Sequence, residues 1–389
     1  MSDNVIILGA GASADAGIPL MGQFVDTMWN IARRGRRAGN VPQKTLEILE
    51  AALEVREELD GFHGRAAFDA WNIEDILSIL SFSNQKSLEK MTKAIASVIE
   101  HTCRVVHDGN LRNHSEKPDM YMSFWRALIA WSQKSNSPIP PVLTFNYDLV
   151  LERSLLRALV GKHYRHSVAF GYQGIEVDYS MRDKVRLKCS DAFWRNEDFS
   201  EVKGMILEEF LPETNFDELK LLTFEILKLH GSVNFSRPHR GRPPRRSGEF
   251  LLKALDDPLI LPPVFNKATD SIGKKVWERA IQVLRKCKHL IICGYSLPQT
   301  DTFMQYFLKA ALGPNQELNR IVVFDPVLFI GVNESDGAAL RKRYAQNFSM
   351  PIQKRIEFSP NCNKGFGKPG GMSHLTATLA THPDSLLFG

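Results

Sequence analysis

The chain has 389 residues, of which 43% are hydrophobic and 24% charged, the composition of a globular protein with a sizeable core. Its net charge of +5, from 49 basic and 44 acidic residues, is too small to indicate nucleic-acid binding by itself. No apolar run is long enough to span a membrane and residues 1–4 do not begin a secretory signal, so we expect a cytoplasmic protein.

The cysteines argue against two further classes of protein. The chain has five of them, an odd number, and no two have the C-x-x-C spacing. We therefore expect neither a disulfide framework nor a structural zinc module.

The start of the chain predicts a strand, a turn and a helix in close succession. Residues 5–8 (VIIL) are fully apolar, residues 9–13 are rich in glycine, and residues 24–29 have a helical pattern. This order is typical of the phosphate-binding start of a dinucleotide-binding fold. Between residues 42 and 135 apolar residues recur at helical spacing, which predicts a helical insertion.

Further strands are predicted at residues 141–145, 225–229, 259–261, 289–293 and 320–324. Residues from about 155 to 222 have no clear period and predict an irregular insertion, and residues 358–371 predict a loop. We therefore predict a three-layer α/β fold with a Rossmann-like parallel sheet. Its dinucleotide-binding domain comprises residues 1–41 and 136–389, and the helical insertion at 42–135 interrupts it.

Four short segments follow predicted strands and carry glycine or polar residues. They are residues 9–13 (GAGAS), 144–148 (TFNYD), 229–232 (LHGS) and 294–297 (GYSL). Ligands bind outside the carboxyl ends of the strands in open α/β sheets. We therefore expect the four segments to form one site.

The first and fourth segments are suited to phosphates. Gly9 and Gly11 permit tight turns and a close approach of a pyrophosphate, to which helix N–H groups and the Ser13 hydroxyl can donate. The fourth segment offers backbone N–H groups and Ser296 to phosphates or a ribose. Asp325, at the end of the last predicted strand, can accept hydrogen bonds from a ribose diol or simply form a strand-end turn.

The second and third segments carry residues suited to catalysis. Asn146 has donors and acceptors that can fix a ribose or a water, and Asp148 can help to orient the same ligand. Both can alternatively cap a helix that is predicted to begin near Leu149. His230 can take a proton from a ribose hydroxyl or a water, and Gly231 leaves room for the ligand.

In this order the four segments resemble the NAD-binding half of the sirtuins. Residues 9–19 match the sirtuin signature at nearly every position, and Leu20 and Met21 then replace an aromatic-arginine pair. Residues 144–148 resemble the family's T-x-N-x-D segment, and His230 stands in the position of its catalytic His-Gly. The G-Y-S form of the fourth segment is similar to a bacterial sirtuin-like branch that acts in antiviral defence.

The resemblance implies NAD as the substrate and a role for each matching residue. The implied catalytic residues are Asn146, His230 and Asp148. The implied NAD-binding residues are Gly9, Ala10, Gly11, Ala12, Ser13, Asp15, Thr144, Gly294, Tyr295, Ser296 and Asp325.

Two features of sirtuin deacylases have no counterpart in the sequence. The cysteines cannot supply a four-cysteine zinc module, and residues 258–264 (PLILPPV) do not match the Phe-Gly-Glu peptide-binding segment. We therefore predict an NAD hydrolase that yields nicotinamide and ADP-ribose, and we expect no metal. The defence branch further implies a cell-arrest effector that forms homo-oligomers and pairs with a HerA-type ATPase.

Three other activities stay open. They are a protein deacylase or ADP-ribosyltransferase, a nuclease, and a non-catalytic sensor of NAD or ADP-ribose. Two arginine-rich stretches, residues 33–37 (RRGRR) and 237–246 (RPHRGRPPRR), are relevant to the nuclease activity. Each can be a solvated surface, a phosphate-binding rim, a nucleic-acid contact or a docking surface for an acidic partner.

Overall fold

The computed structural model describes most of the chain. The described residues are 2–61, 69, 71–105, 120–159, 171–180, 184–188, 218–236, 252–261, 271–298, 301–328, 334–359 and 371–387. The arginine-rich stretch at 237–246 and much of the predicted irregular insertion at 155–222 lie outside these residues.

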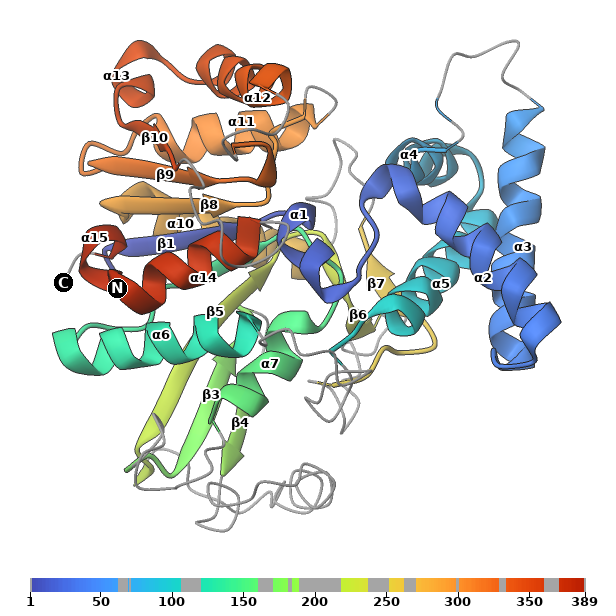
Figure 1. Cartoon of the computed structure of the whole chain (residues 1–389), viewed down its shortest axis with the longest axis horizontal. Helices are drawn as coiled ribbons and strands as arrows, with labels where there is room; N and C mark the ends of the chain where they lie inside the picture. The colour runs from blue at the N-terminus through green and yellow to red at the C-terminus, as the bar shows by residue number, and fades with distance from the viewer. Residues whose placement is uncertain are drawn as a thin grey trace.

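An eight-stranded sheet forms the centre of the molecule (Figure 1). All neighbouring strands are parallel except β3 and β4, which confirms the predicted α/β fold with a Rossmann-like sheet. The order across the sheet is β10 (Ile356–Phe358), β9 (Arg320–Phe324), β8 (His289–Cys293), β1 (Asn4–Leu8), β2 (Val142–Thr144), β5 (Leu221–Lys228), β3 (Gly174–Asp178) and β4 (Val185–Lys188).

One of the predicted strands lies outside this sheet. Strand β7 (Pro258–Ile260) pairs in antiparallel fashion with β6 (Gly231–Ser236), which begins directly after His230. The hairpin-like pair therefore lies beside the third segment and extends away from the carboxyl end of β5.

The strands are apolar because helices cover both faces of the sheet. Val5 and Ile7 of β1 pack with α10 (Ser271–Lys286), α11 (Thr302–Leu312) and α12 (Glu334–Asn347). Ile6 and Leu8 of the same strand pack on the other face, in a core that includes helices α6, α7 and α14. These helices span Met120–Ser135, Val150–Leu159 and Gly371–Thr381. Burying each such Ile or Leu side chain contributes about 1.5–3 kcal/mol to folding.

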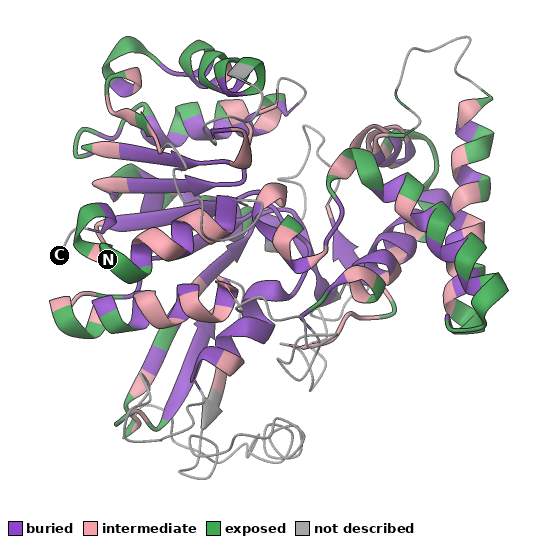
Figure 2. Cartoon of the chain, viewed as in Figure 1, coloured by how far each residue is buried: buried purple, intermediate pink, exposed green. Residues whose placement is uncertain are grey.

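Four helices form a separate lobe that faces the carboxyl edge of the sheet (Figure 1). They are α2 (Phe24–Ala38), α3 (Gln43–Asp60), α4 (Ile73–Ser83) and α5 (Gln85–Thr102). Their inward side chains are buried and their outer faces are exposed (Figure 2). The fourth helix between residues 42 and 135, α6, lies instead on the sheet, against α7 and α14. None of the described helices is long and apolar enough to cross a membrane.

The short elements complete the described chain. Helix α1 (Ala10–Ser13) and the 3-10 turns η1 (Ala14–Ala16) and η2 (Met21–Gln23) connect β1 to α2. The 3-10 turn η6 (Pro326–Leu328) follows β9, and α13 (Met350–Gln353) and α15 (Pro383–Leu386) flank the last strand and helix.

The topology places a switch point at the carboxyl ends of β1 and β8. From β1 the chain continues to β2 and β5 on one side, and only later returns to β8 on the other side. Ligands bind at such a switch point in open α/β sheets.

Candidate functional site

The four predicted segments meet at this switch point. The first and fourth pack directly on each other, because the N–H groups of Gly9 and Gly11 donate to the carbonyls of Cys293 and Gly294, both at 2.9 Å. A Cβ atom on Gly294, whose φ is +64°, would lie 2.2 Å from the backbone nitrogen of Ala12. A Cβ atom on Gly9 would lie 2.5 Å from the Gly294 carbonyl oxygen. Glycine is therefore required here for the packing of one turn on the other.

This packing occupies part of the predicted phosphate cradle. The N–H groups of Gly9 and Gly11 are already used within the protein. The N–H of Ala12 is used as well, because it donates to the Gly9 carbonyl at 2.9 Å. The hydroxyl of Ser13 accepts a hydrogen bond from Asn146, so its own proton can point elsewhere. The Ser13 hydroxyl is therefore one donor that the first segment can offer to an anion. The neighbouring Ala10 begins α1.

Asn146 lies between the first two segments. Its amide nitrogen donates to the Gly9 carbonyl at 2.9 Å and to Ser13 Oγ at 2.7 Å. Its backbone N–H donates to Thr144 Oγ1 at 3.1 Å. Since the Gly9 carbonyl can only accept, the amide nitrogen must face it. Asn146 Oδ1 is then left as a buried acceptor with no hydrogen-bond partner among the described residues.

An unsatisfied acceptor of this kind is costly. Leaving a buried polar atom without a partner costs about 1–3 kcal/mol. Asn146 is only 8% exposed, and its side chain does not cap the following helix. Asn146 Oδ1 is thus available to accept a hydrogen bond from a bound hydroxyl or water.

His230 lies in an aromatic enclosure at the end of β5. It is 4% exposed, and its ring centroid lies 5.4 Å from that of Phe145, 6.3 Å from Tyr147 and 6.2 Å from Trp277, to which it is stacked. Gly231 follows with a φ of +81°, and a Cβ atom there would lie 2.1 Å from the Leu259 carbonyl oxygen. The turn into β6 therefore depends on glycine, and the surrounding rings fix the orientation of the imidazole.

Asp148 caps helix α7. Its Oδ1 accepts from the N–H of Val150 at 3.0 Å, which is the capping role that the sequence left open. The residue is buried at the end of the second segment. A catalytic role for Asp148 stays a prediction.

The fourth segment is held from behind by helix α12. Arg343 Nε donates to the Ser296 carbonyl at 2.8 Å, and the Tyr344 hydroxyl donates to the Tyr295 carbonyl at 2.8 Å. The Tyr295 ring packs 4.7 Å from that of Phe145, and its hydroxyl donates to Asp301 Oδ2 at 3.0 Å. The Tyr295 side chain is therefore part of the core, and only its backbone is suited to contact a ligand.

Asp325 lies beside this segment, after β9. Its Oδ1 accepts from the N–H of Val327 at 3.1 Å, so the strand-end turn that the sequence left open is present. Burial raises the pKa of Asp325 above its ordinary value, although the Val327 N–H and the nearby Arg343 oppose the shift.

Helix α14 forms a side of the site that the sequence did not indicate. Ser373 Oγ donates to Asp15 Oδ2 at 3.2 Å, which joins this helix to the predicted NAD-binding aspartate two residues after the first segment. The ring of His374 meets Phe324 edge to face at 4.9 Å, and its Nε2 lies 3.5 Å from Ser359 Oγ. No motif marks these residues, because α14 begins where the sequence predicts the end of a loop.

The burial of His374 predicts a pH dependence of stability. Burial lowers its pKa below the ordinary 6.5, so the unfolded chain binds more protons than the folded chain below about that pH. The free energy of unfolding is therefore expected to decrease as the pH falls from 7.5 to 5.5, as urea denaturation can measure. Burial also lowers the pKa of His289, so His289 changes the free energy of unfolding in the same direction.

The variant His374→Gln separates the two histidines. In this variant the free energy of unfolding should decrease less over the same pH range, because only His289 still has a lowered pKa. The raised pKa of Asp325 is common to both proteins and cancels in the comparison. Parallel pH profiles for the variant and the wild type would contradict the expectation.

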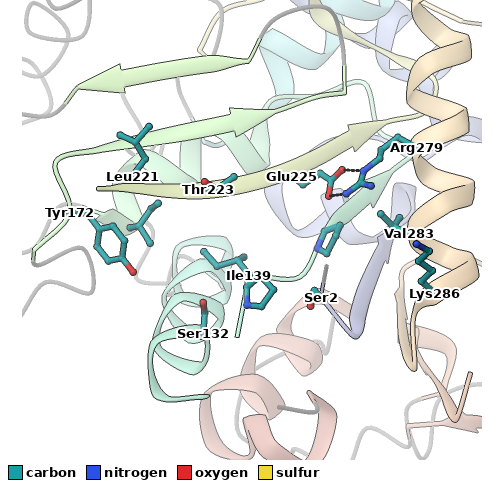
Figure 3. Close-up of a pocket in the computed structure, with 13 residues that line it drawn as sticks. Ser2, Ser132, Ile139, Tyr172, Leu221, Thr223, Glu225, Arg279, Val283 and Lys286 are labelled. Atoms are coloured by element: carbon teal, nitrogen blue, oxygen red, sulfur yellow. Dashed lines mark hydrogen bonds and ion pairs between the residues drawn. The ribbon is translucent and has the colours of Figure 1, made fainter. Parts of the chain in front are cut away.

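A well-defined pocket lies at the opposite end of the sheet (Figure 3). Its volume is about 300 Å³. It is lined by the first part of β5, the loop between α6 and β2, and helix α10. Within it the Arg279 Nε atom pairs with Glu225 Oε1 at 2.5 Å and its Nη2 atom with Oε2 at 3.1 Å. Because it adjoins the amino ends of β1, β2 and β5, this pocket is separate from the four segments.

The first arginine-rich stretch lies on the lobe. The guanidinium of Arg33 lies 4.9 Å from the ring centroid of Trp29 on α2, and Arg36 pairs with Glu50 of α3 at 2.5 Å. The second stretch, 237–246, lies outside the described residues. A role of either stretch in nucleic-acid binding stays a prediction.

The cysteines in the described part of the chain are buried thiols. Burial raises the pKa of Cys103 to about 11 and that of Cys287 to about 12, and it also raises that of Cys293. Among the described residues, no group of three or more His, Cys, Asp or Glu side chains could hold a metal ion.

Fold and site together define an α/β protein of Rossmann-like type with polar and glycine-rich segments at the switch point of its sheet. No protein-family model and no curated protein sequence matches the chain. Among solved structures it is similar to a Sir2 homologue in complex with NAD, with 13% identity, a TM-score of 0.40 and coverage of 98% of this chain and 90% of that one.

Two other solved structures give comparable values. A mutant Sir2 homologue in complex with ADP-ribose has 12% identity and a TM-score of 0.40, over 99% of this chain and 94% of that one. Sir2Tm bound to a propionylated peptide has 10% identity and a TM-score of 0.35, over 97% and 91%.

Proposed function

We propose that the chain hydrolyses NAD to nicotinamide and ADP-ribose. The observation that carries this proposal is the arrangement of Asn146, whose buried Oδ1 has no partner among the described residues and whose nitrogen is fixed by the glycine-rich turn. Such an oxygen can accept a hydrogen bond from a ribose hydroxyl or from the water that attacks the ribose carbon. Holding that hydroxyl or water fixes the geometry of the reacting atoms.

His230 supplies the proton transfer in this proposal. The reaction breaks the bond between the nicotinamide nitrogen and the ribose carbon, and forms a bond from that carbon to the water oxygen. The water loses one proton, which a neutral imidazole can accept, and nicotinamide leaves uncharged. The aromatic enclosure formed by Phe145, Tyr147 and Trp277 keeps bulk water away from the ring.

The remaining contacts would hold the nucleotide. Ser13 Oγ and the backbone N–H groups of Tyr295 and Ser296 are suited to the phosphates, whereas the N–H of Gly294 donates to the Phe324 carbonyl at 2.9 Å. Asp325 is suited to a ribose diol. Asp15 and Ser373, which are hydrogen-bonded to each other, border the same end of the site.

The test is nicotinamide release by the purified full chain. Asn146→Ala is expected to lower turnover of NAD about a hundredfold, because the reacting atoms lose their anchor. Asn319→Ala provides the matched control, since Asn319 is exposed and lies on the loop before β9, and it should leave turnover unchanged. Equal turnover in Asn146→Ala and wild type would contradict the proposal.

The other activities give different results in the same assay. Formation of O-acyl-ADP-ribose or of labelled protein would favour a deacylase or an ADP-ribosyltransferase. Binding of NAD without any turnover would favour a sensor, and metal-dependent DNA cleavage that survives Asn146→Ala would favour a nuclease.

The resemblance to the defence branch leads us to propose a cellular role as well. The chain would arrest infected bacterial cells by depleting NAD, as a homo-oligomer paired with a HerA-type ATPase. The assay is therefore run with the chain alone and with a co-expressed ATPase of that type, and the oligomeric state is measured by light scattering.

A further inference from the structure

A buried ion pair lies directly behind the site. Lys228, the last residue of β5, is 3% exposed, and Glu152, in the first turn of α7, is 1% exposed. Lys228 Nζ and Glu152 Oε1 are 3.1 Å apart. The Tyr179 hydroxyl donates to the same Glu152 oxygen at 3.3 Å.

The ammonium group of Lys228 has a second partner in the second segment. It donates a hydrogen bond to the backbone carbonyl of Asp148, two residues after Asn146. Lys228 lies opposite Thr144 in the register of β2 and β5, and two residues before His230. One side chain thus connects the strand that leads to His230 with the segment that carries Asn146.

Backbone hydrogen bonds hold the rest of this segment. The N–H of Phe145 donates to Leu8, that of Leu229 to Thr144, and that of Val233 to Tyr147, at 3.2, 2.9 and 3.0 Å respectively. These bonds fix the segment as far as Tyr147. The carbonyl of Asp148 is held by the Lys228 ammonium instead.

Stability alone is a poor reason for such a pair. Removing two charges from water is so unfavourable that well-packed apolar residues often serve as well or better. An apolar pair, however, could not donate a hydrogen bond to Asp148. Glu152 is needed in turn because it neutralises the buried ammonium and directs it.

We propose that Lys228 is a positioning residue, which sets the place of Asn146 relative to His230 by holding the Asp148 carbonyl, with Glu152 orienting its ammonium. This inference rests on the proposed NAD hydrolysis for its effect on turnover. Its effect on the segment itself does not depend on that function.

The test is the double variant Lys228→Met/Glu152→Met. Because the pair is replaced by apolar residues of similar length, we expect a Tm within a few degrees of wild type. The kcat for NAD should fall about a hundredfold, since misplacement of reacting groups has effects of that order, while KM changes little. A second double variant, Lys228→Gln/Glu152→Gln, retains a neutral donor toward Asp148 and should recover part of the lost kcat.

The matched control is Glu225→Met/Arg279→Met. It removes another ion pair that involves β5, between Glu225 of that strand and Arg279 of α10 (Figure 3). Arg279 is bound to Glu225 through contacts of 2.5 and 3.1 Å, and neither residue belongs to the segments that carry Asn146 and His230, so kcat should stay at the wild-type value. Equal losses of kcat in the two Met pairs would overturn the proposal.

Hydrogen exchange of residues 144–150 gives a readout that does not require activity. In Lys228→Met/Glu152→Met it should become faster in this segment and stay unchanged elsewhere. Unchanged exchange there overturns the positioning role, whatever the turnover. Faster exchange in a protein whose wild type does not cleave NAD supports the positioning role and contradicts the proposed function, so the two failures are distinguishable.

Discussion

Replacing His230 by asparagine is expected to lower the kcat of NAD hydrolysis by about a hundred- to ten-thousand-fold, the usual contribution of general-base catalysis. Asparagine is polar and fits within the space of an imidazole, but it cannot take up a proton at neutral pH. The measurement is nicotinamide release at saturating NAD. The Tm should change by only a few degrees, because each of the ring contacts with Phe145, Tyr147 and Trp277 is worth about 0.5–1.5 kcal/mol.

The control for this variant is His382→Asn. His382 is exposed and precedes α15, far from the four segments along the described chain, so its replacement should leave kcat unchanged. Binding of ADP-ribose separates the two roles that His230 could have. If His230→Asn loses binding and stability together but keeps its kcat, His230 is a packing residue and the proton must be transferred by another group.

The strands that the sequence predicted are those buried on both faces. Strands β1, β8 and β9 are continuous apolar runs, because helices cover both sides of the sheet at its centre. The strands β3 and β4 carry charged residues that pair across the antiparallel edge, such as Glu176 with Arg186, so their sequence has no clear period. Such a cross-strand ion pair becomes visible only when the register is known.

The sequence also predicted which segments would meet, but not why their residues are needed. Carboxyl ends of parallel strands share one edge of a sheet, so a ligand site could be expected there. That Asn146 is held by Gly9, 137 residues earlier in the chain, could not be predicted. The buried pair of Lys228 and Glu152 was equally hidden, because a lysine in a strand and a glutamate in a helix are ordinarily solvated.

Gly294→Ala is expected to destabilise the protein strongly. The φ of Gly294 is +64°, and an alanine Cβ atom would lie 2.2 Å from Ala12 N and 2.5 Å from Gly11 C, both backbone atoms that no side-chain rotation can move away. The free energy of unfolding should fall by about 2–5 kcal/mol, from roughly 1–2 kcal/mol of dihedral strain and about 1–3 kcal/mol of overpacking. Urea denaturation measures this loss.

Gly39→Ala separates the two causes. Gly39 ends α2 with nearly the same φ, +63°, but a Cβ atom there has nothing within 4 Å. Its replacement therefore carries the dihedral strain without the clash, and should cost about 1–2 kcal/mol. The excess loss in Gly294→Ala then reports the packing of the fourth segment on the first.

Because that packing also positions the Gly9 carbonyl that holds Asn146, only Gly294→Ala should reduce NAD turnover in the fraction that remains folded. Equal losses of stability in the two variants would mean that the two turns are not packed as tightly as these distances imply.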